Sequence, residues 1–388
     1  MIVDAIRAAA RPLSLAACVI ALAGCSSYSL PTWLGGIDRP KPAPLVDNPA
    51  TLGVRQAWAA KVGSVDFPLS VNVQGTTVTL ASGDGAIVAL DAGSGRELWR
   101  ANAGGALAAG VGSDGKVTAV VTRDNDLVAF EAGKEIWRQK LSVGVYTAPF
   151  VAGARVFILL ADRSVSAYDG QNGRRLWTQA RAAQQQPLVL KHAGVMLAVG
   201  DTLLVGQQGR LAGFNPLTGA PRWEAPVATP RGINDVERVV DLVGSVSRIA
   251  DNVCVRAFQA AVGCVDASRG AVVWSKPANG TEGVDGDGSF VFGTEWNGTV
   301  NAYKRADGDR AWTTDMLSHR GLTGPLVLGR AVVIGDSLGY VHLLNREDGK
   351  LLNRVATDGS AIVAAPALAG TTLVVVTKNG GVYGFAPQ

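Results

Sequence analysis

One recurring motif constrains the fold of this chain more than any other feature. Its best copy, residues 89–99, reads as the end of a β-strand, a tight turn with Asp91 and Gly95, and a second strand that reaches Trp99. In every copy a Gly stands four residues before the aromatic position. Further copies end at Trp137, Trp177, Trp223, Trp274 and Trp312, and a degenerate copy carries Asn353 instead. Such a chain is organised by its repeats rather than by its total length.

The spacing of the motif predicts a propeller. Neighbouring aromatic positions, counted from Trp58, are 38 to 51 residues apart, and about forty residues fit four short strands, which is one blade. Residues 149–153 and 325–329 read as innermost strands. The pairs Asp84-Gly85 and Asn297-Gly298 supply the positive φ that a two-residue hairpin turn requires.

The two ends of the chain predict how the ring closes. The last repeat, residues 365–388, has no fourth strand, whereas residues 55–58 form a fourth strand with no repeat before it. Joining them completes a last blade and leaves no open edge. We therefore expect residues 51–388 to form an all-β, eight-bladed propeller with four antiparallel strands per blade; seven blades are the main alternative.

The recurrent indoles are interpreted as structural groups that pack between adjacent blades. A buried Trp removes roughly 150–250 Å² of surface from water, which stabilises such an interface strongly. The residues are Trp58, Trp99, Trp137, Trp177, Trp223, Trp274 and Trp312.

The N-terminus is typical of an exported protein. Arg7 and Arg11 precede an apolar run, residues 12–24, which is too short to span a bilayer but suits a signal peptide. The run ends in Leu-Ala-Gly-Cys25, which resembles the lipobox of bacterial lipoproteins; the alternative is an ordinary secretory signal with a chance Cys. The expected division is a signal peptide at 1–24, then lipidated Cys25 and a flexible Pro-rich tether to residue 50. Ser26 after the Cys implies sorting to the outer membrane, by resemblance to the lipoprotein rule.

Cys254 and Cys264 stand on the two sides of a predicted hairpin turn near residues 257–261. Their even separation can place both side chains on one face of the sheet. In an oxidising compartment a cross-strand disulfide is expected, and two buried thiols are the alternative.

The composition offers little for catalysis. The repeat resembles the tryptophan-docking motif of pyrroloquinoline-quinone dehydrogenases, but their adjacent cysteines are missing, and so are nucleophile-elbow and phosphate-loop motifs. Asp285-Gly286-Asp287-Gly288 lacks the downstream Glu of a Ca²⁺ loop and is interpreted as a turn before the strand 289–292.

A carbohydrate-binding propeller is a further alternative, although only 6% of the chain is aromatic. No catalytic residue, metal or cofactor is predicted, and a net charge of +4 without basic runs does not favour nucleic acid.

Two long connections are the candidates for function. The spacings Trp177–Trp223 and Trp223–Trp274 exceed forty residues, so segments 184–191 and 231–241 are extra loop on a rigid scaffold. Leucines beside a cation on one loop and mixed charges on the other suit a protein-docking surface. Trp296 is interpreted as a packed hairpin residue, and an exposed aromatic for partner contact is the alternative.

Lipobox, Pro-rich tether and Trp-docked repeats together resemble the BamB family of lipoproteins in the β-barrel assembly machinery. The resemblance implies a non-catalytic scaffold on the periplasmic side of the outer membrane that binds the POTRA domains of BamA and joins other subunits. Nascent outer-membrane proteins are a further candidate partner. Lys191 stands where that family has Arg, and Val243 replaces an acid. The residues matched to the family's binding loops are Leu188, Leu190, Lys191, Arg238 and Asp241.

Overall fold

The computed structural model describes residues 40–180, 189–230 and 239–388. Residues 42–388 form one compact unit, and residues 1–41 form another of which only Pro40 and Lys41 are described. The described residues contain β-strands and no helix, and thus no helix that could cross a membrane.

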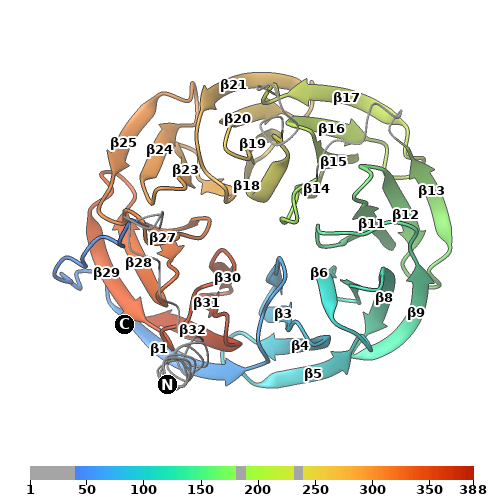
Figure 1. Cartoon of the computed structure of the whole chain (residues 1–388), viewed down its shortest axis with the longest axis horizontal. Coiled ribbons are helices and arrows are strands. Elements are labelled where there is room, and N and C mark those ends of the chain that lie inside the picture. The colour runs from blue at the N-terminus through green and yellow to red at the C-terminus, as the bar shows by residue number, and fades with distance from the viewer. Residues whose placement is uncertain (1–39, 181–188, 231–238) are drawn as a thin grey trace, which may run out of the picture. The chain divides into compact units, whose positions relative to one another are not determined.

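The unit formed by residues 42–388 is a ring of eight four-stranded sheets, so the prediction of an eight-bladed propeller is confirmed (Figure 1). Blades 1 to 4 consist of β2 (Asn72–Gln74), β3 (Thr77–Ala81), β4 (Ala86–Asp91), β5 (Glu97–Asn102); β6 (Leu107–Ser113), β7 (Val117–Thr122), β8 (Asp126–Glu131), β9 (Lys134–Lys140); β10 (Phe150–Ala152), β11 (Arg155–Leu159), β12 (Val165–Asp169), β13 (Arg175–Gln179); and β14 (Met196–Val199), β15 (Thr202–Gln207), β16 (Arg210–Phe214), β17 (Pro221–Pro226). Blades 5 to 8 consist of β18 (Leu242–Ile249), β19 (Asn252–Ala257), β20 (Ala261–Asp266), β21 (Ala271–Pro277); β22 (Val284–Gly286), β23 (Phe290–Thr294), β24 (Val300–Lys304), β25 (Arg310–Thr314); β26 (Leu326–Leu328), β27 (Ala331–Gly335), β28 (Tyr340–Asn345), β29 (Leu351–Ala356); and β30 (Ala367–Ala369), β31 (Thr372–Val376), β32 (Gly381–Pro387), β1 (Val54–Lys61).

Burial follows the position of each strand within its blade. Middle strands are covered on both faces by neighbouring blades, so β7 is buried at every residue and is rich in Val and Thr. The outermost strands face solvent on one side, and β5 therefore alternates between exposed and half-buried residues. The first strands of the blades line a central hollow of ≈ 560 Å³.

The ring closes as the ends of the chain predicted. β1 is the fourth strand of blade 8 and pairs antiparallel with β32, from Val54 opposite Pro387 to Lys61 opposite Gly381. Figure 1 shows the blue first strand beside the red last one.

Each indole of the motif contacts the turn of the next blade. A Cβ on Gly95 would lie 2.5 Å from the ring of Trp58, so only glycine fits there, and its φ of +70° also requires glycine. The Trp58 Nε1–H donates to the Ala92 carbonyl at 2.7 Å. The same donation, to a carbonyl of the next blade, is made by Trp137, Trp177, Trp274 and Trp312.

Asn353 occupies the motif position that has no indole. Blade 8 offers no turn between its third and fourth strands on which an indole could pack. The third and fourth strands of blade 8, β32 and β1, come from opposite ends of the chain and are not joined by a motif turn. The Asn353 amide instead donates to the Leu52 carbonyl at 2.7 Å and accepts from Asn48 at 3.0 Å.

Residues 43–52, which we call the strap, run along blade 7 before β1 begins. The Ala43 N–H donates to the Ser318 carbonyl at 2.8 Å, and the Thr51 N–H donates to the Leu352 carbonyl at 2.8 Å. The expected tether to residue 50 is therefore already fixed to the propeller from Ala43, because backbone groups of the strap pair with blade 7.

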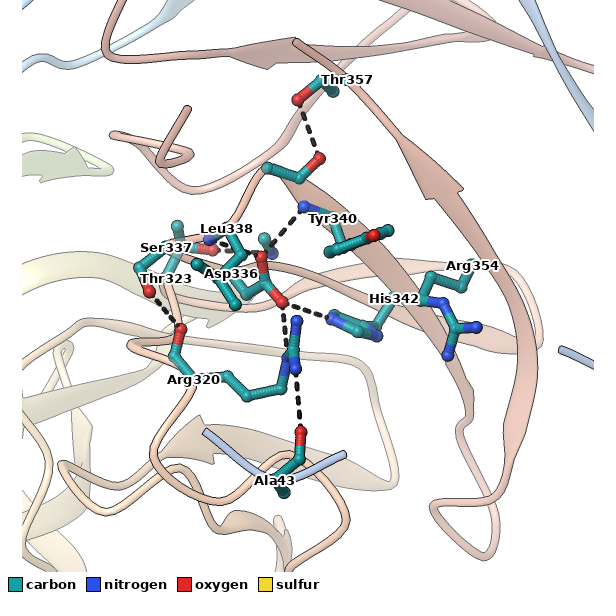
Figure 2. Close-up of polar contacts among 12 residues, drawn as sticks. Ala43, Arg320, Thr323, Asp336, Ser337, Leu338, Tyr340, His342, Arg354 and Thr357 are labelled. Atoms are coloured by element: carbon teal, nitrogen blue, oxygen red, sulfur yellow. Dashed lines mark hydrogen bonds and ion pairs between the residues drawn. The ribbon is translucent and has the colours of Figure 1, made fainter. Parts of the chain in front are cut away.

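A buried polar cluster holds the beginning of the strap (Figure 2). Arg320 donates through Nε to Asp336 at 2.7 Å and through Nη1 to the Ala43 carbonyl at 2.9 Å. His342 Nε2 lies 3.0 Å from the same Asp336 oxygen, and both side chains are fully buried. Because the carboxylate can only accept, His342 carries its proton on Nε2.

Cys254 and Cys264 are joined by a disulfide. They face each other directly in β19 and β20, with Cα atoms 3.9 Å apart, and both are fully buried. The bridge lies in the interior of blade 5, beside Trp274.

Candidate docking site

The turns of the propeller lie on two rims, because successive strands of a blade are antiparallel. The connection rim carries the connections between blades, such as residues 103–106, and the turns between second and third strands, such as 82–85. The motif rim carries the turns between third and fourth strands, such as 92–96. The described residues that precede β14 and β18 in the two long connections, 189–195 and 239–241, therefore belong to the connection rim.

Three of the site residues predicted from the sequence, Cys25, Leu188 and Arg238, lie outside the described residues. Leu190 is half-buried, Lys191 is exposed and Asp241 is half-buried. Val243, at the position of the missing acid, is 1% exposed in the first strand of blade 5.

The two connections meet where the first strands of blades 4 and 5 begin. The Gly244 N–H donates to the Ala193 carbonyl at 2.8 Å, and Gly194 forms an antiparallel bridge with Val243. Leu190, Asp241 and Val243 consequently line one small hollow. Two segments that are far apart in the sequence thus form one site.

Asp241 is oriented by Arg163, which the sequence analysis did not identify. The Arg163 guanidinium donates through Nη2 to Asp241 Oδ1 at 3.1 Å, and the two side chains are only 10% and 17% exposed. The Arg163 carbonyl accepts from Gln207 Nε2 at 2.7 Å, so the turn that carries Arg163 is itself fixed. The other carboxylate oxygen of Asp241 is buried without a hydrogen-bond partner.

A sequence signal for Arg163 exists in the repeat. Arg163 has a φ of +66° in the turn between the second and third strands. At the corresponding turn three other blades use Gly85, Asn125 and Gly298, which tolerate positive φ, and blades 4 and 5 hold Gln208 and Gln259 at positive φ. A bulky cation at this position is strained, and strain of this kind concentrates at functional sites.

Lys191 and His192 extend the site toward the ring axis. The Lys191 Nζ lies 5.9 Å from the centre of the Tyr146 ring, within range of a cation–π interaction. His192 Nε2 lies 3.4 Å from Glu282 Oε1. Burial lowers the pKa of His192, but the hydrogen bond and charge of Glu282 outweigh it, and the pKa lies above its usual value.

A second hollow, of ≈ 570 Å³, adjoins the first. Leu190 lines both hollows, and the second is otherwise mainly apolar. Its apolar lining includes Pro226, Val239, Val240, Phe258 and Pro277. The site therefore combines an apolar floor with charged groups at one end, which is typical of a protein interface.

Trp296 corrects a sequence-based interpretation. It was expected to be a packed hairpin residue, but its side chain is 57% exposed on the turn between β23 and β24. The neighbouring Glu295 takes the buried position of this turn instead, because it pairs with Arg256 of blade 5.

The described residues contain no cluster of His, Cys, Asp and Glu that could hold a metal ion. Asp285 and Asp287, which faintly resemble a Ca²⁺ loop, bind protein groups. Asp285 accepts from the Val327 N–H at 2.7 Å, and Asp287 accepts from Ser289, Phe290 and Arg346.

Comparisons with known proteins give a consistent result. The family model described as outer membrane protein assembly factor BamB matches residues 83–314 and 297–388. An outer membrane protein assembly factor BamB of Burkholderia pseudomallei is 38% identical over 98% of each chain. The crystal structure of BamB from Moraxella catarrhalis covers 86% of this chain and 99% of its own, with a TM-score of 0.78 and 23% identity.

The structure of a quinohemoprotein alcohol dehydrogenase from Comamonas testosteroni is also similar, with a TM-score of 0.66 and 16% identity over 87% of this chain and 77% of its own. At that identity the likeness shows the fold alone.

Proposed function

Because the chain belongs to the BamB family of outer membrane protein assembly factors, we propose that it serves this assembly as a non-catalytic scaffold that binds the POTRA domains of BamA. The binding surface is the docking site on the connection rim, with Leu190, Lys191 and Asp241 at its centre. Leu188 and Arg238, which belong to the same two segments of the sequence, are proposed to contribute to binding as well.

One observation carries the proposal: the two long connections converge on a single buried ion pair beside an apolar hollow. Breaking a buried pair costs several kcal/mol, roughly 3–5, so the pair holds Asp241 in one orientation. A preorganised site loses less conformational entropy when a partner binds. Lys191 cannot make the bidentate contact of an Arg, so we propose that it contributes through charge and through Tyr146.

Lipidation at Cys25 would place the scaffold on the periplasmic face of the outer membrane. The lipobox residues Leu22-Ala23-Gly24-Cys25 support this anchor. The Cys254–Cys264 disulfide agrees with an oxidising compartment such as the periplasm. Several acyl chains on one Cys contribute about 0.8 kcal/mol per buried methylene, which is enough for stable anchoring.

The test is copurification of BamA with the full-length lipoprotein in detergent. We expect Leu190→Ala to weaken the complex about tenfold or more, because the variant removes apolar area that the interface would bury. Leu217→Ala, an exposed Leu on the motif rim, is the matched control and should bind as the wild type does. Equal recovery of BamA with Leu190→Ala would remove this residue from the interface.

A further inference from the structure

We propose that Trp296 is a second anchor for the same partner, so that the BamA contact extends along the connection rim from blade 4 to blade 6. This inference rests on the proposed function. Trp296 is the one exposed Trp among the described residues, and Trp is strongly enriched among residues that dominate interface energetics.

The turn that presents Trp296 is braced by a buried ion pair. The Arg256 side chain is fully buried, and both Nη1 and Nη2 lie 3.4 Å from Glu295 Oε1. Glu295 also accepts from the Asn301 amide at 3.1 Å and from the Asn279 N–H. Its side chain is only 9% exposed, so the pair is shielded from solvent.

Two glycines make room for the crossing of Arg256 from blade 5 to blade 6. A Cβ on Gly280 would lie 2.4 Å from Arg256 Nη1, and a Cβ on Gly293 would lie 2.2 Å from Nη2. A buried ion pair contributes little net stability compared with an apolar packing of the same volume. Its effect here is to fix the backbone of Glu295 and Trp296 in one position.

The rest of the turn is equally constrained. The Trp296 N–H donates to the Asn279 carbonyl at 3.1 Å, and the Gly298 N–H donates to the Glu295 carbonyl at 2.9 Å. The His319 N–H donates to the Asn297 carbonyl at 2.7 Å. Trp296 is therefore exposed on a rigid support, and a rigid aromatic anchor loses little entropy on binding.

Trp296 is continuous with the docking site through shared walls. Gln259, Ala260 and Pro277 line both the second hollow and the hollow of ≈ 570 Å³ beside Trp296. Leu190 joins the second hollow to the Arg163–Asp241 pair. A single domain that binds at Leu190 can thus also contact Trp296, because the two hollows share these residues and lie on the same rim.

The lining indicates the chemistry of the part that contacts Trp296. Ala278, Asn279, Asn297 and Thr299 are uncharged, Arg310 is an exposed cation of the lining, and the carboxylate of Glu295 is already occupied by Arg256 and Asn301. The part of the POTRA domain that contacts Trp296 therefore carries an apolar side chain for the exposed indole and polar groups for the surrounding amides and hydroxyls, whereas its charged groups meet Asp241, Lys191 and Arg310.

The experiment measures the affinity of full-length lipoprotein for full-length BamA in detergent. We expect Trp296→Ala to weaken the affinity at least tenfold and Trp296→Phe, which keeps a flat ring, to restore most of it. Leu217→Ala, 61% exposed on the motif rim, controls for the loss of an exposed apolar side chain and should leave the affinity unchanged. Because Trp296 is a surface residue, all variants should fold.

Three outcomes would overturn the inference. If Trp296→Ala binds as the wild type does while Leu190→Ala is weakened, the second anchor is wrong and the proposed function stands. If the wild type does not bind BamA, both fail together. If the lipoprotein alone self-associates and Trp296→Ala abolishes this, the occupant is a second copy of the chain.

Discussion

At the scale of single residues, the docking site depends on a side chain held in an unfavourable backbone conformation. Arg163 keeps φ at +66° while its guanidinium pairs with Asp241. A side chain in the left-handed region costs about 1–2 kcal/mol relative to glycine. Two substitutions of Arg163 can distinguish the effect of the backbone strain on stability from the effect of the ion pair on binding.

We predict that Arg163→Gly and Arg163→Ala weaken the proposed binding to BamA equally, because both remove the Arg163 guanidinium that pairs with Asp241. Arg163→Gly should be more stable than Arg163→Ala by about 1 kcal/mol, because glycine adopts this φ without strain. Urea unfolding and copurification check the two parts. Unequal binding by the two variants would mean that backbone conformation, and not the ion pair, sets affinity.

The buried His342 makes stability depend on pH. Burial lowers the pKa of His342, and the hydrogen bond that His342 donates to Asp336 opposes this without reversing it. Burial would raise the pKa of Asp336, but hydrogen bonds from His342, the Tyr340 N–H and Arg320 outweigh it, so Asp336 stays ionised. His342 is thus neutral in the folded protein, and protonating it opposes folding.

We predict that the free energy of unfolding falls as pH drops from the ordinary His pKa near 6.5 toward the lower folded value. His342→Gln, which keeps a donor toward Asp336, should show a shallower loss between pH 7 and 5. Denaturant unfolding across this range checks it. His192, whose pKa is raised, acts with the opposite sign in both proteins and cancels in the comparison. Parallel pH profiles would contradict the prediction.

At the scale of elements, the indole, the glycine turn and the neighbouring blade form one unit. Trp312 packs on Gly349 of the next blade and donates to the Arg346 carbonyl at 2.8 Å. Asn353 has no such turn to contact and binds the strap instead. The repeat therefore changes at the interface with blade 8, whose third and fourth strands come from opposite ends of the chain.

We predict that restoring the motif residue with Asn353→Trp destabilises the protein by about 1–3 kcal/mol, because the Leu52 carbonyl loses its donor. Trp312→Ala should cost roughly 3–5 kcal/mol, as for other buried aromatics. Urea unfolding of both variants measures these values. A gain in stability with Asn353→Trp would show that blade 8 can accommodate an indole, which would contradict the prediction.

The sequence predicted the elements better than the site. Motif spacing gave eight blades, and the lone strand at Trp58 gave the pairing of β1 with β32, since both follow from local pattern. The bridge between Gly194 and Val243 depends on where two loops meet in space, and no local pattern encodes it. The prediction that Trp296 is packed is wrong because an Asn-Gly turn does not indicate which neighbouring side chain is buried. Here the buried side chain is that of Glu295.

At the scale of the whole molecule, the strap fixes where the N-terminal segment leaves the propeller. Ala43 is bound at Ser318 and Arg320, on the connection between blades 6 and 7. Arg354 holds the middle of the strap by donating to the Val46 carbonyl at 3.0 Å. Ala43, where the strap begins, thus lies on the rim that carries the docking site.

We predict that Arg354→Ala raises the rate of cleavage between residues 43 and 48 by a broad-specificity protease severalfold, because local opening of the strap becomes easier. The rest of the propeller should stay resistant. Arg96→Ala, on the motif rim, serves as the control and should be cleaved as the wild type is. Mass spectrometry of early fragments locates the cut, and unchanged cleavage would show that Arg354 does not hold the strap.

Because β1 pairs with β32, the ring can close only after β32 has been synthesised. A chain that stops early leaves β1 without its neighbour, and unpaired strand edges invite aggregation and proteolysis. Truncated products that lack β32 therefore all expose the same unpaired edge of β1, wherever they end.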